Sequence, residues 1–95
     1  MGKATRDPLK DLLTHLQYAA LSCLVDGPCS GREIREYLES IDRKKSPVAF
    51  YLLMSRIEGA GYAKGWGDEE GKWYELTNSG RRALDRTQAF YRGGN

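Results

Sequence analysis

The hydrophobic period of the sequence changes once, at Gly59-Ala60-Gly61. N-terminal to these residues, apolar side chains recur three and four positions apart, which is the spacing of amphipathic helices. C-terminal to them are two short aromatic-rich segments, residues 62–66 and 72–76, whose composition favours β-strands. A glycine-flanked loop of five residues, 67–71, joins the two segments and predicts a β-hairpin. The chain is therefore expected to place helices before a single hairpin.

Cap residues divide the remaining sequence into four helices. The first is predicted to start at Asp7-Pro8 and to end at Asp26-Gly27-Pro28, with Gly27 left-handed and Pro28 preventing continuation. The second starts with the capping-box pattern Ser30-x-x-Glu33, and its inner face is expected to hold Ile34, Tyr37, Leu38 and Ile41. Ser46-Pro47 caps the third helix. Thr77-Asn78-Ser79 precedes a fourth helix, placed over residues 78–92.

This order predicts an α+β, mostly helical fold: a winged helix-turn-helix with the elements helix, helix, helix, β-hairpin, helix. The second and third helices would form the helix-turn-helix, and the hairpin would be the wing. A single bridge from Cys29 could add a third short strand to the hairpin. The 95 residues suit one domain, 1–95, in which residues 1–7 are expected to be flexible.

The distribution of charge is more informative than the net charge of +2. From Arg43 to Arg56 there are four positive charges and no negative one, which is the local clustering expected beside nucleic acid. No apolar run approaches the roughly 18 residues that a membrane span needs, and the N-terminus is too polar for a secretory signal. We therefore expect a cytoplasmic protein that does not contact membranes.

Few residues of the sequence could support catalysis or metal binding. His15 is the only histidine and lies among apolar residues, and with Cys23 and Cys29 it lacks the spacing of a zinc site. Cys23 is expected in the core, and Cys29 is a redox-sensing thiol only if it is exposed. The sequence contains neither a glycine-rich phosphate loop nor a carboxylate pair arranged for chemistry. We expect no enzyme activity, no catalytic residue, no metal and no cofactor.

The third helix has the composition of a helix that enters the major groove of DNA. If Phe50, Leu53, Met54 and Ile57 face inward, small and polar side chains remain on the outer and flanking faces, as base readout requires. These outer residues are Ser46, Val48, Ala49, Tyr51, Leu52 and Ser55. Leu52 either meets a thymine methyl group or belongs to the core, and we expect the core or its edge. Lys44, Lys45 and Ser46 are candidate phosphate contacts, as are Lys64 and Lys72 of the hairpin.

Four motifs occur in one order between about residues 16 and 84. They are Gly27-Pro28-Cys29-Ser30-Gly31-Arg32-Glu33-Ile34, Ser46-Pro47-Val48-Ala49-Phe50-Tyr51, Arg56-Ile57-Glu58 with Gly61-Tyr62, and the run from Gly71 to Gly80. In order and spacing the chain resembles the PadR-like transcriptional regulators, in a short form without a long C-terminal domain. The resemblance implies a homodimeric, sequence-specific DNA-binding regulator, usually a repressor. It also implies DNA contacts at Ala49, Tyr51 and Ser55.

The first and last helices carry more apolar residues than one small core needs, and they are expected to form the dimer. The predicted interface residues are Leu9, Leu13, Leu84, Phe90 and Tyr91. Double-stranded DNA is the expected partner, with a small-molecule inducer unidentified. The alternative is a winged-helix module that binds proteins and not DNA. Its support is the acidic hairpin tip, Asp68-Glu69-Glu70, together with Ala49 and Ser55.

Overall fold

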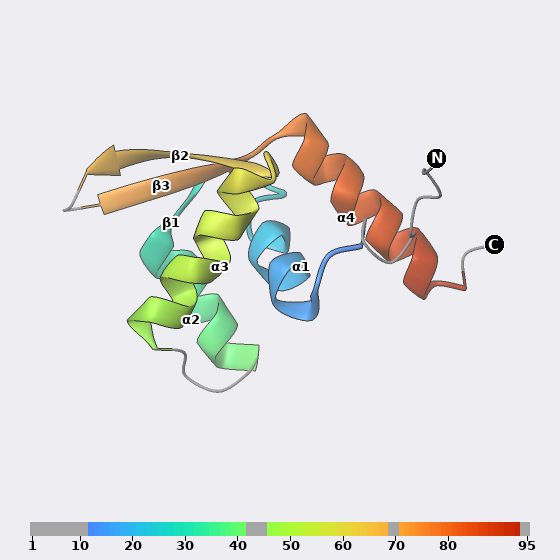
Figure 1. Cartoon of the computed structure of the whole chain (residues 1–95), viewed down its shortest axis with the longest axis horizontal. Helices are drawn as coiled ribbons and strands as arrows, with labels where there is room; N and C mark the ends of the chain where they lie inside the picture. The colour runs from blue at the N-terminus through green and yellow to red at the C-terminus, as the bar shows by residue number, and fades with distance from the viewer. Residues whose placement is uncertain (1–11, 42–45, 69–70, 94–95) are drawn as a thin grey trace, which may run out of the picture.

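The computed structural model describes residues 12–41, 46–68 and 71–93, and the predicted flexible segment 1–7 lies outside these ranges. The described elements are α1 (His15–Ser22), β1 (Cys29–Ser30), α2 (Gly31–Ile41), α3 (Pro47–Gly59), β2 (Ala63–Asp68), β3 (Gly71–Leu76) and α4 (Asn78–Tyr91). The strands form one antiparallel sheet in the order β1-β3-β2. In Figure 1 the hairpin projects from one end of the molecule and α4 lies at the other. The predicted winged helix-turn-helix fold is confirmed.

The first helix is shorter than predicted at both ends. Thr14 caps α1 in a reciprocal capping box with Gln17, so the helix begins at His15. The predicted start at Asp7-Pro8 lies outside the described residues, but Leu12 and Leu13 are not helical. One continuous helix from Pro8 is therefore wrong. The predicted end is also wrong, because α1 stops at Ser22, and Gly27 takes its positive φ of 148° in the turn leading to β1.

The caps predicted for α2 and α3 are confirmed. The backbone N–H of Glu33 donates to the Ser30 hydroxyl at 3.1 Å, and the Ser30 N–H donates to the Glu33 carboxylate at 2.8 Å. The Ser46 hydroxyl accepts from the Ala49 N–H at 3.0 Å. On α2 only Ile34 and Leu38 of the predicted inner face are buried. Tyr37 and Ile41 are exposed, so the buried stripe of this helix is narrower than predicted.

The hairpin is longer than predicted and its loop is shorter. Pairing continues outward from Trp66↔Trp73 through Gly67↔Lys72 to Asp68↔Gly71, so residues 69–70 connect the strands. Gly67 permits this extension, because its φ of 116° and its close approach to the Gly71 carbonyl leave no room for a side chain. The tip residues Glu69 and Glu70 lie outside the described residues. The third strand expected at Cys29 is present, with Cys29 opposite Tyr74.

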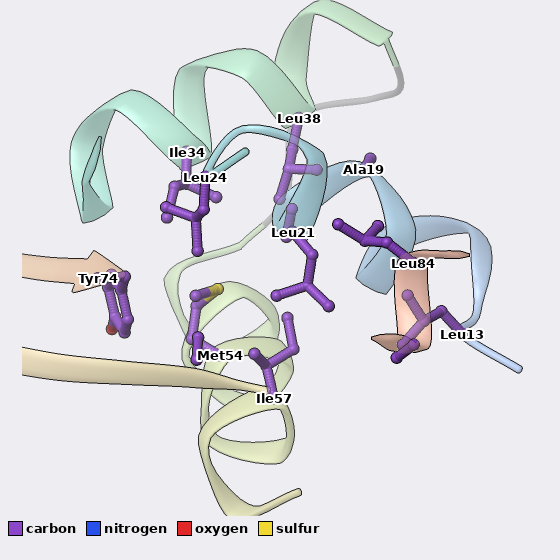
Figure 2. Close-up of a cluster of buried hydrophobic side chains, with 13 residues drawn as sticks. Leu13, Ala19, Leu21, Leu24, Ile34, Leu38, Met54, Ile57, Tyr74 and Leu84 are labelled. Atoms are coloured by element: carbon purple, nitrogen blue, oxygen red, sulfur yellow. The ribbon is translucent and has the colours of Figure 1, made fainter. Parts of the chain in front are cut away.

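The core draws on α1, α2, α3, β3 and α4 (Figure 2). Leu21, Ile34, Leu38 and Ile57 are fully buried at its centre. Leu13 and Leu84 were predicted to lie in a dimer interface, but they are 4% and 7% exposed within this single chain. The Leu13 N–H donates to the buried Thr87 hydroxyl at 3.0 Å, which ties the segment before α1 to α4. Both leucines are therefore core residues, which corrects the prediction.

Candidate nucleic-acid interface

The outer face of α3 is the part of this helix that the core leaves uncovered. Met54 and Ile57 are buried, and Phe50 and Leu53 pack against the core from partly buried positions. The remaining side is exposed and presents Ser46, Val48, Ala49, Tyr51, Leu52, Ser55 and Arg56. The predicted contact residues Ser46, Ala49, Tyr51 and Ser55 thus all reach solvent on one helix.

Leu52 belongs to this outer face and not to the core, so of the expected core or edge position only the edge is compatible with the structure. The side chain is 47% exposed. At 100° per residue, position 52 falls beside Val48 and Ser55 and well away from Ile57. Val48 and Tyr51 are more exposed still, at 67% and 68%. Val48, Tyr51 and Leu52 therefore form an apolar stripe on the exposed side of α3.

Lys72 of the wing is held by the end of α3. Its Nζ lies 3.2 Å from Glu58 Oε2 and 5.4 Å from the centre of the Tyr74 ring. The hydrogen bond that Lys72 donates to Glu58 raises the pKa of Lys72, and the nearby Tyr74 and Tyr51 raise it further. Sequence reasoning missed Glu58, because its partner is recognised only once the hairpin is packed on the helix.

Gly65 makes room for this ion pair. A Cβ atom at position 65 would lie 2.7 Å from Glu58 Oε2 and 2.9 Å from Lys72 Cε. The register places Gly65 opposite Tyr74, on the buried side of the hairpin. A glycine at this position therefore lets the Glu58–Lys72 pair close between α3 and the wing.

The other face of the wing is exposed and aromatic. Trp66 and Trp73 are register partners across the two strands, and their exposures are 43% and 42%. Strand alternation puts them opposite the buried Tyr74 face. Lys64 is exposed on this outer face and faces Glu75 across the strands.

A groove of about 500 Å³ lies between the start of α2, the side of α3 and strand β3. It brings Arg32 and Lys72 to one surface, although forty residues separate them in the sequence. Arg35, the other early cation of α2, pairs with Glu39 at 3.5 Å, whereas Arg32 has no ion pair within the described ranges. Its lining residues are Ser30, Gly31, Arg32, Phe50, Gly71, Lys72, Trp73 and Tyr74. Two cations at one groove suit an oxyanion such as phosphate.

Three predicted site residues, Leu9, Lys44 and Lys45, lie outside the described residues. Of the predicted dimer contacts, Phe90 and Tyr91 are exposed and meet edge to face, with ring centres 5.2 Å apart. They lie near the end of α4, where a second groove of about 500 Å³ is lined by both α1 and α4. These two aromatic residues are the part of the predicted dimer surface that the structure leaves accessible.

The two cysteines are partly buried and have raised pKa values. Burial raises the pKa of Cys23 to about 11, and burial also raises that of Cys29. The Cys29 thiol donates to the Cys23 carbonyl at 3.2 Å. Thiols with raised pKa values are poor nucleophiles at neutral pH, which argues against redox sensing by Cys29.

No three His, Cys, Asp or Glu side chains gather to hold a metal in the part of the chain that is described. Across those same residues, no helix is both long and apolar enough to cross a membrane.

No family model and no curated protein matches the sequence. Solved structures match it in shape. A PadR family transcription regulator from Clostridium difficile is 24% identical, over 83% of this chain and 88% of that one, with a TM-score of 0.73. RosR from H. salinarum is 21% identical, over 86% and 76% of the two chains, with a TM-score of 0.77. BpsR from Bordetella bronchiseptica is 18% identical, over 85% and 56%, with a TM-score of 0.68. The chain therefore has a PadR-like winged helix-turn-helix fold.

Proposed function

We propose that the chain is a sequence-specific DNA-binding transcriptional regulator that places α3 in the major groove and the wing on the backbone or in the minor groove. The observation that carries this proposal is the outer face of α3, where Val48, Tyr51 and Ser55 are exposed on a helix anchored by Met54 and Ile57. An α-helix fits the major groove, whose width is about 12 Å, and its N-terminal turns meet the base edges.

Groups suited to phosphate flank this face. Arg32 and Lys72 share the groove beside α3, and the Ser46 cap stands at the positive end of the helix dipole. In the sequence, Lys44 and Lys45 come directly before Ser46. Phosphate contacts of this kind fix the position of a protein on the duplex, while base contacts supply the sequence preference.

The proposal includes a homodimer that represses transcription. Phe90 and Tyr91 provide exposed aromatic surface at the end of α4, beside the groove between α1 and α4. A two-fold dimer through this surface would present two copies of α3 to half-sites about 34 Å apart. The repressor role follows the resemblance to PadR-like regulators. DNA binding is also the property named for BpsR, where 6-hydroxynicotinic acid regulates it.

The second candidate is a module that binds proteins and not DNA. One observation favours it: Lys72, a predicted DNA contact, is already paired with Glu58. The uncharged stripe of Val48 and Leu52 would then meet an apolar partner surface. We favour DNA because Arg32, at the groove beside α3, has no ion pair among the described residues.

Titration of the full chain against duplex DNA at about 50 and 200 mM salt separates the two candidates. A DNA-binding regulator binds at low salt and weakens as counterions compete, with a slope of about −0.9 per phosphate contacted. The substitution Arg32→Met should reduce that slope by about 1. Its matched control is Arg35→Met, which removes a cation already paired with Glu39 and should leave the slope unchanged. The proposal is refuted if the chain does not bind DNA at low salt, or if its affinity does not change with salt concentration.

A sedimentation measurement tests the dimer separately. The full chain should sediment as two copies, and Phe90→Ala with Tyr91→Ala should shift it toward one copy. The control is Tyr37→Ala, which removes another exposed aromatic residue from α2. A wild-type protein that sediments as a single copy at the concentrations that bind DNA would contradict the homodimer.

A further inference from the structure

About the first two and a half turns of α3 lack the side chains that usually identify bases. From Pro47 to Ser55 the sequence holds no Arg, Lys, Asn, Gln, Asp or Glu. Bidentate hydrogen bonds from Arg or Lys to guanine and from Asn or Gln to adenine are the common specific contacts in the major groove. The polar groups on the outer side of these turns are the hydroxyls of Tyr51 and Ser55, which can form single hydrogen bonds. Most of the readout by these turns must therefore be apolar.

The apolar groups form a continuous stripe. Val48 and Leu52 are four residues apart, so they are neighbours on adjacent turns, and they are 67% and 47% exposed. The methyl group of Ala49 is exposed beside Val48. One helical turn advances about 5.4 Å, and successive base pairs are about 3.4 Å apart. Two neighbouring side chains of the stripe can thus face bases one or two steps apart.

Charges near the stripe suit the surroundings of a major groove. Arg56 is exposed one turn beyond Leu52, and Arg32 lies across the groove beside α3. The carboxylate of Glu58 is paired with Lys72, so it is compensated where phosphates would approach. An apolar stripe that ends beside the exposed Arg56 suits a groove floor with apolar groups between two phosphate backbones.

We infer that Val48 and Leu52 read the 5-methyl groups of thymine, so that the preferred duplex places thymines against the first two turns of α3. The thymine methyl is the apolar group that a base pair presents in the major groove. Tyr51 and Ser55 add single hydrogen bonds at the edge of this contact. The inference rests on the proposed DNA binding and names the chemistry by which that binding would be specific.

Uracil substitution tests the inference directly, because uracil differs from thymine by this methyl group. Duplexes that the full chain binds best are first selected from random DNA. Each dT of the selected duplex is then replaced by dU, one position at a time. We expect about a fourfold loss of affinity at each contacted position and roughly a fifteenfold loss for two, on the basis of about 0.8 kcal/mol per buried methyl-sized group. Replacement outside the footprint should change nothing.

Protein variants assign the methyl groups to side chains. In Val48→Ala and Leu52→Ala the loss caused by uracil should shrink at one thymine position each, as expected for a contact in a double-mutant cycle. Val25→Ala is the matched control, because Val25 is an exposed valine in the turn after α1 and should leave every uracil effect intact. Val48 and Leu52 are surface residues, so thermal melting should confirm that both variants remain folded.

Each outcome has a definite meaning. Position-specific uracil losses that disappear in the Val48 or Leu52 variant support the inference. Equal affinity for thymine and uracil duplexes overturns it and leaves DNA binding in place. Failure to bind any duplex at low salt overturns the proposed function and the inference together, and a protein partner then becomes the better explanation of the stripe.

Discussion

The helix α3 and the wing both expose one face to solvent, but their charged side chains are arranged differently. From Pro47 to Ser55, the outer face of α3 carries no Arg, Lys, Asp or Glu side chain. In the described part of the wing, each lysine faces a carboxylate: Lys72 pairs with Glu58, and Lys64 stands opposite Glu75 in the strand register. Under the proposed function, α3 would contact the bases, and the wing would be held in position beside it.

The inner side of the wing explains how that position is held. Glu58 reaches from α3 to Lys72, and Gly65 leaves the space in which they meet. An exposed ion pair contributes only about 0–1 kcal/mol, so this contact adds little to the stability of the domain. We expect it instead to orient the wing, since Tyr74 packs into the core beside it.

The largest expected effect separates the two sides of α3. Ile57→Ala should lower the free energy of unfolding by about 2–5 kcal/mol, because Ile57 is fully buried. Leu52→Ala should change it by less than about 0.5 kcal/mol, because the side chain is half exposed. Chemical denaturation of both variants measures the difference. A comparable loss of stability in Leu52→Ala would show that Leu52 belongs functionally to the core.

Much of this distinction could be predicted from the sequence. The inner residues of α3 follow from helical spacing, and the Ser46 and Ser30 caps follow from local hydrogen bonding. The true start of α1 could not be predicted, because Thr14 and Gln17 form a competing cap inside an apolar pattern that continues on both sides. The Glu58–Lys72 pair could not be predicted either, since it depends on how the hairpin packs on α3.

The next largest effect is expected on the affinity for DNA when the Tyr51 hydroxyl is removed. Tyr51→Phe keeps the ring and removes the hydroxyl, which donates no hydrogen bond to other described residues. If that hydroxyl contacts a phosphate or a base, affinity for DNA should fall about tenfold, as expected for a hydrogen bond to a charged group. Thermal stability should not change, because Tyr51 is 68% exposed. A band shift of wild type and variant gives the comparison, with Tyr37→Phe as control. Unchanged affinity would remove the hydroxyl from the interface.

A smaller effect tests whether the wing lysine serves DNA or α3. Glu58→Gln removes the carboxylate but keeps a side chain of similar size, so Lys72 would face phosphate unopposed. We expect affinity to rise by up to about fivefold and the salt slope to steepen. Lys72→Met should flatten the slope only slightly, because Glu58 already offsets this charge. Weaker binding by Glu58→Gln would instead indicate that wing orientation matters more than the charge of Lys72.

The smallest effect is a loosening of the wing at alkaline pH. The hydrogen bond that Lys72 donates to Glu58 raises the pKa of Lys72, and burial raises the pKa of Tyr74, so in both cases the folded-state pKa lies above the unfolded value. The folded state therefore holds these protons more tightly, and their contribution to stability is present below about pH 10 and is lost as pH rises through the folded values.

Tryptophan fluorescence measures this change, because Trp66 and Trp73 are the only two tryptophans and both lie in the wing strands. We expect the emission to shift above about pH 10. The shift should be smaller in Tyr74→Phe and in Lys72→Met, which each remove one titrating group. Cys23→Ala serves as the control, since its thiol titrates near pH 11 at the end of α1 and not in the wing. A shift of the same size in all three variants would mean that the inner-face contact does not position the wing.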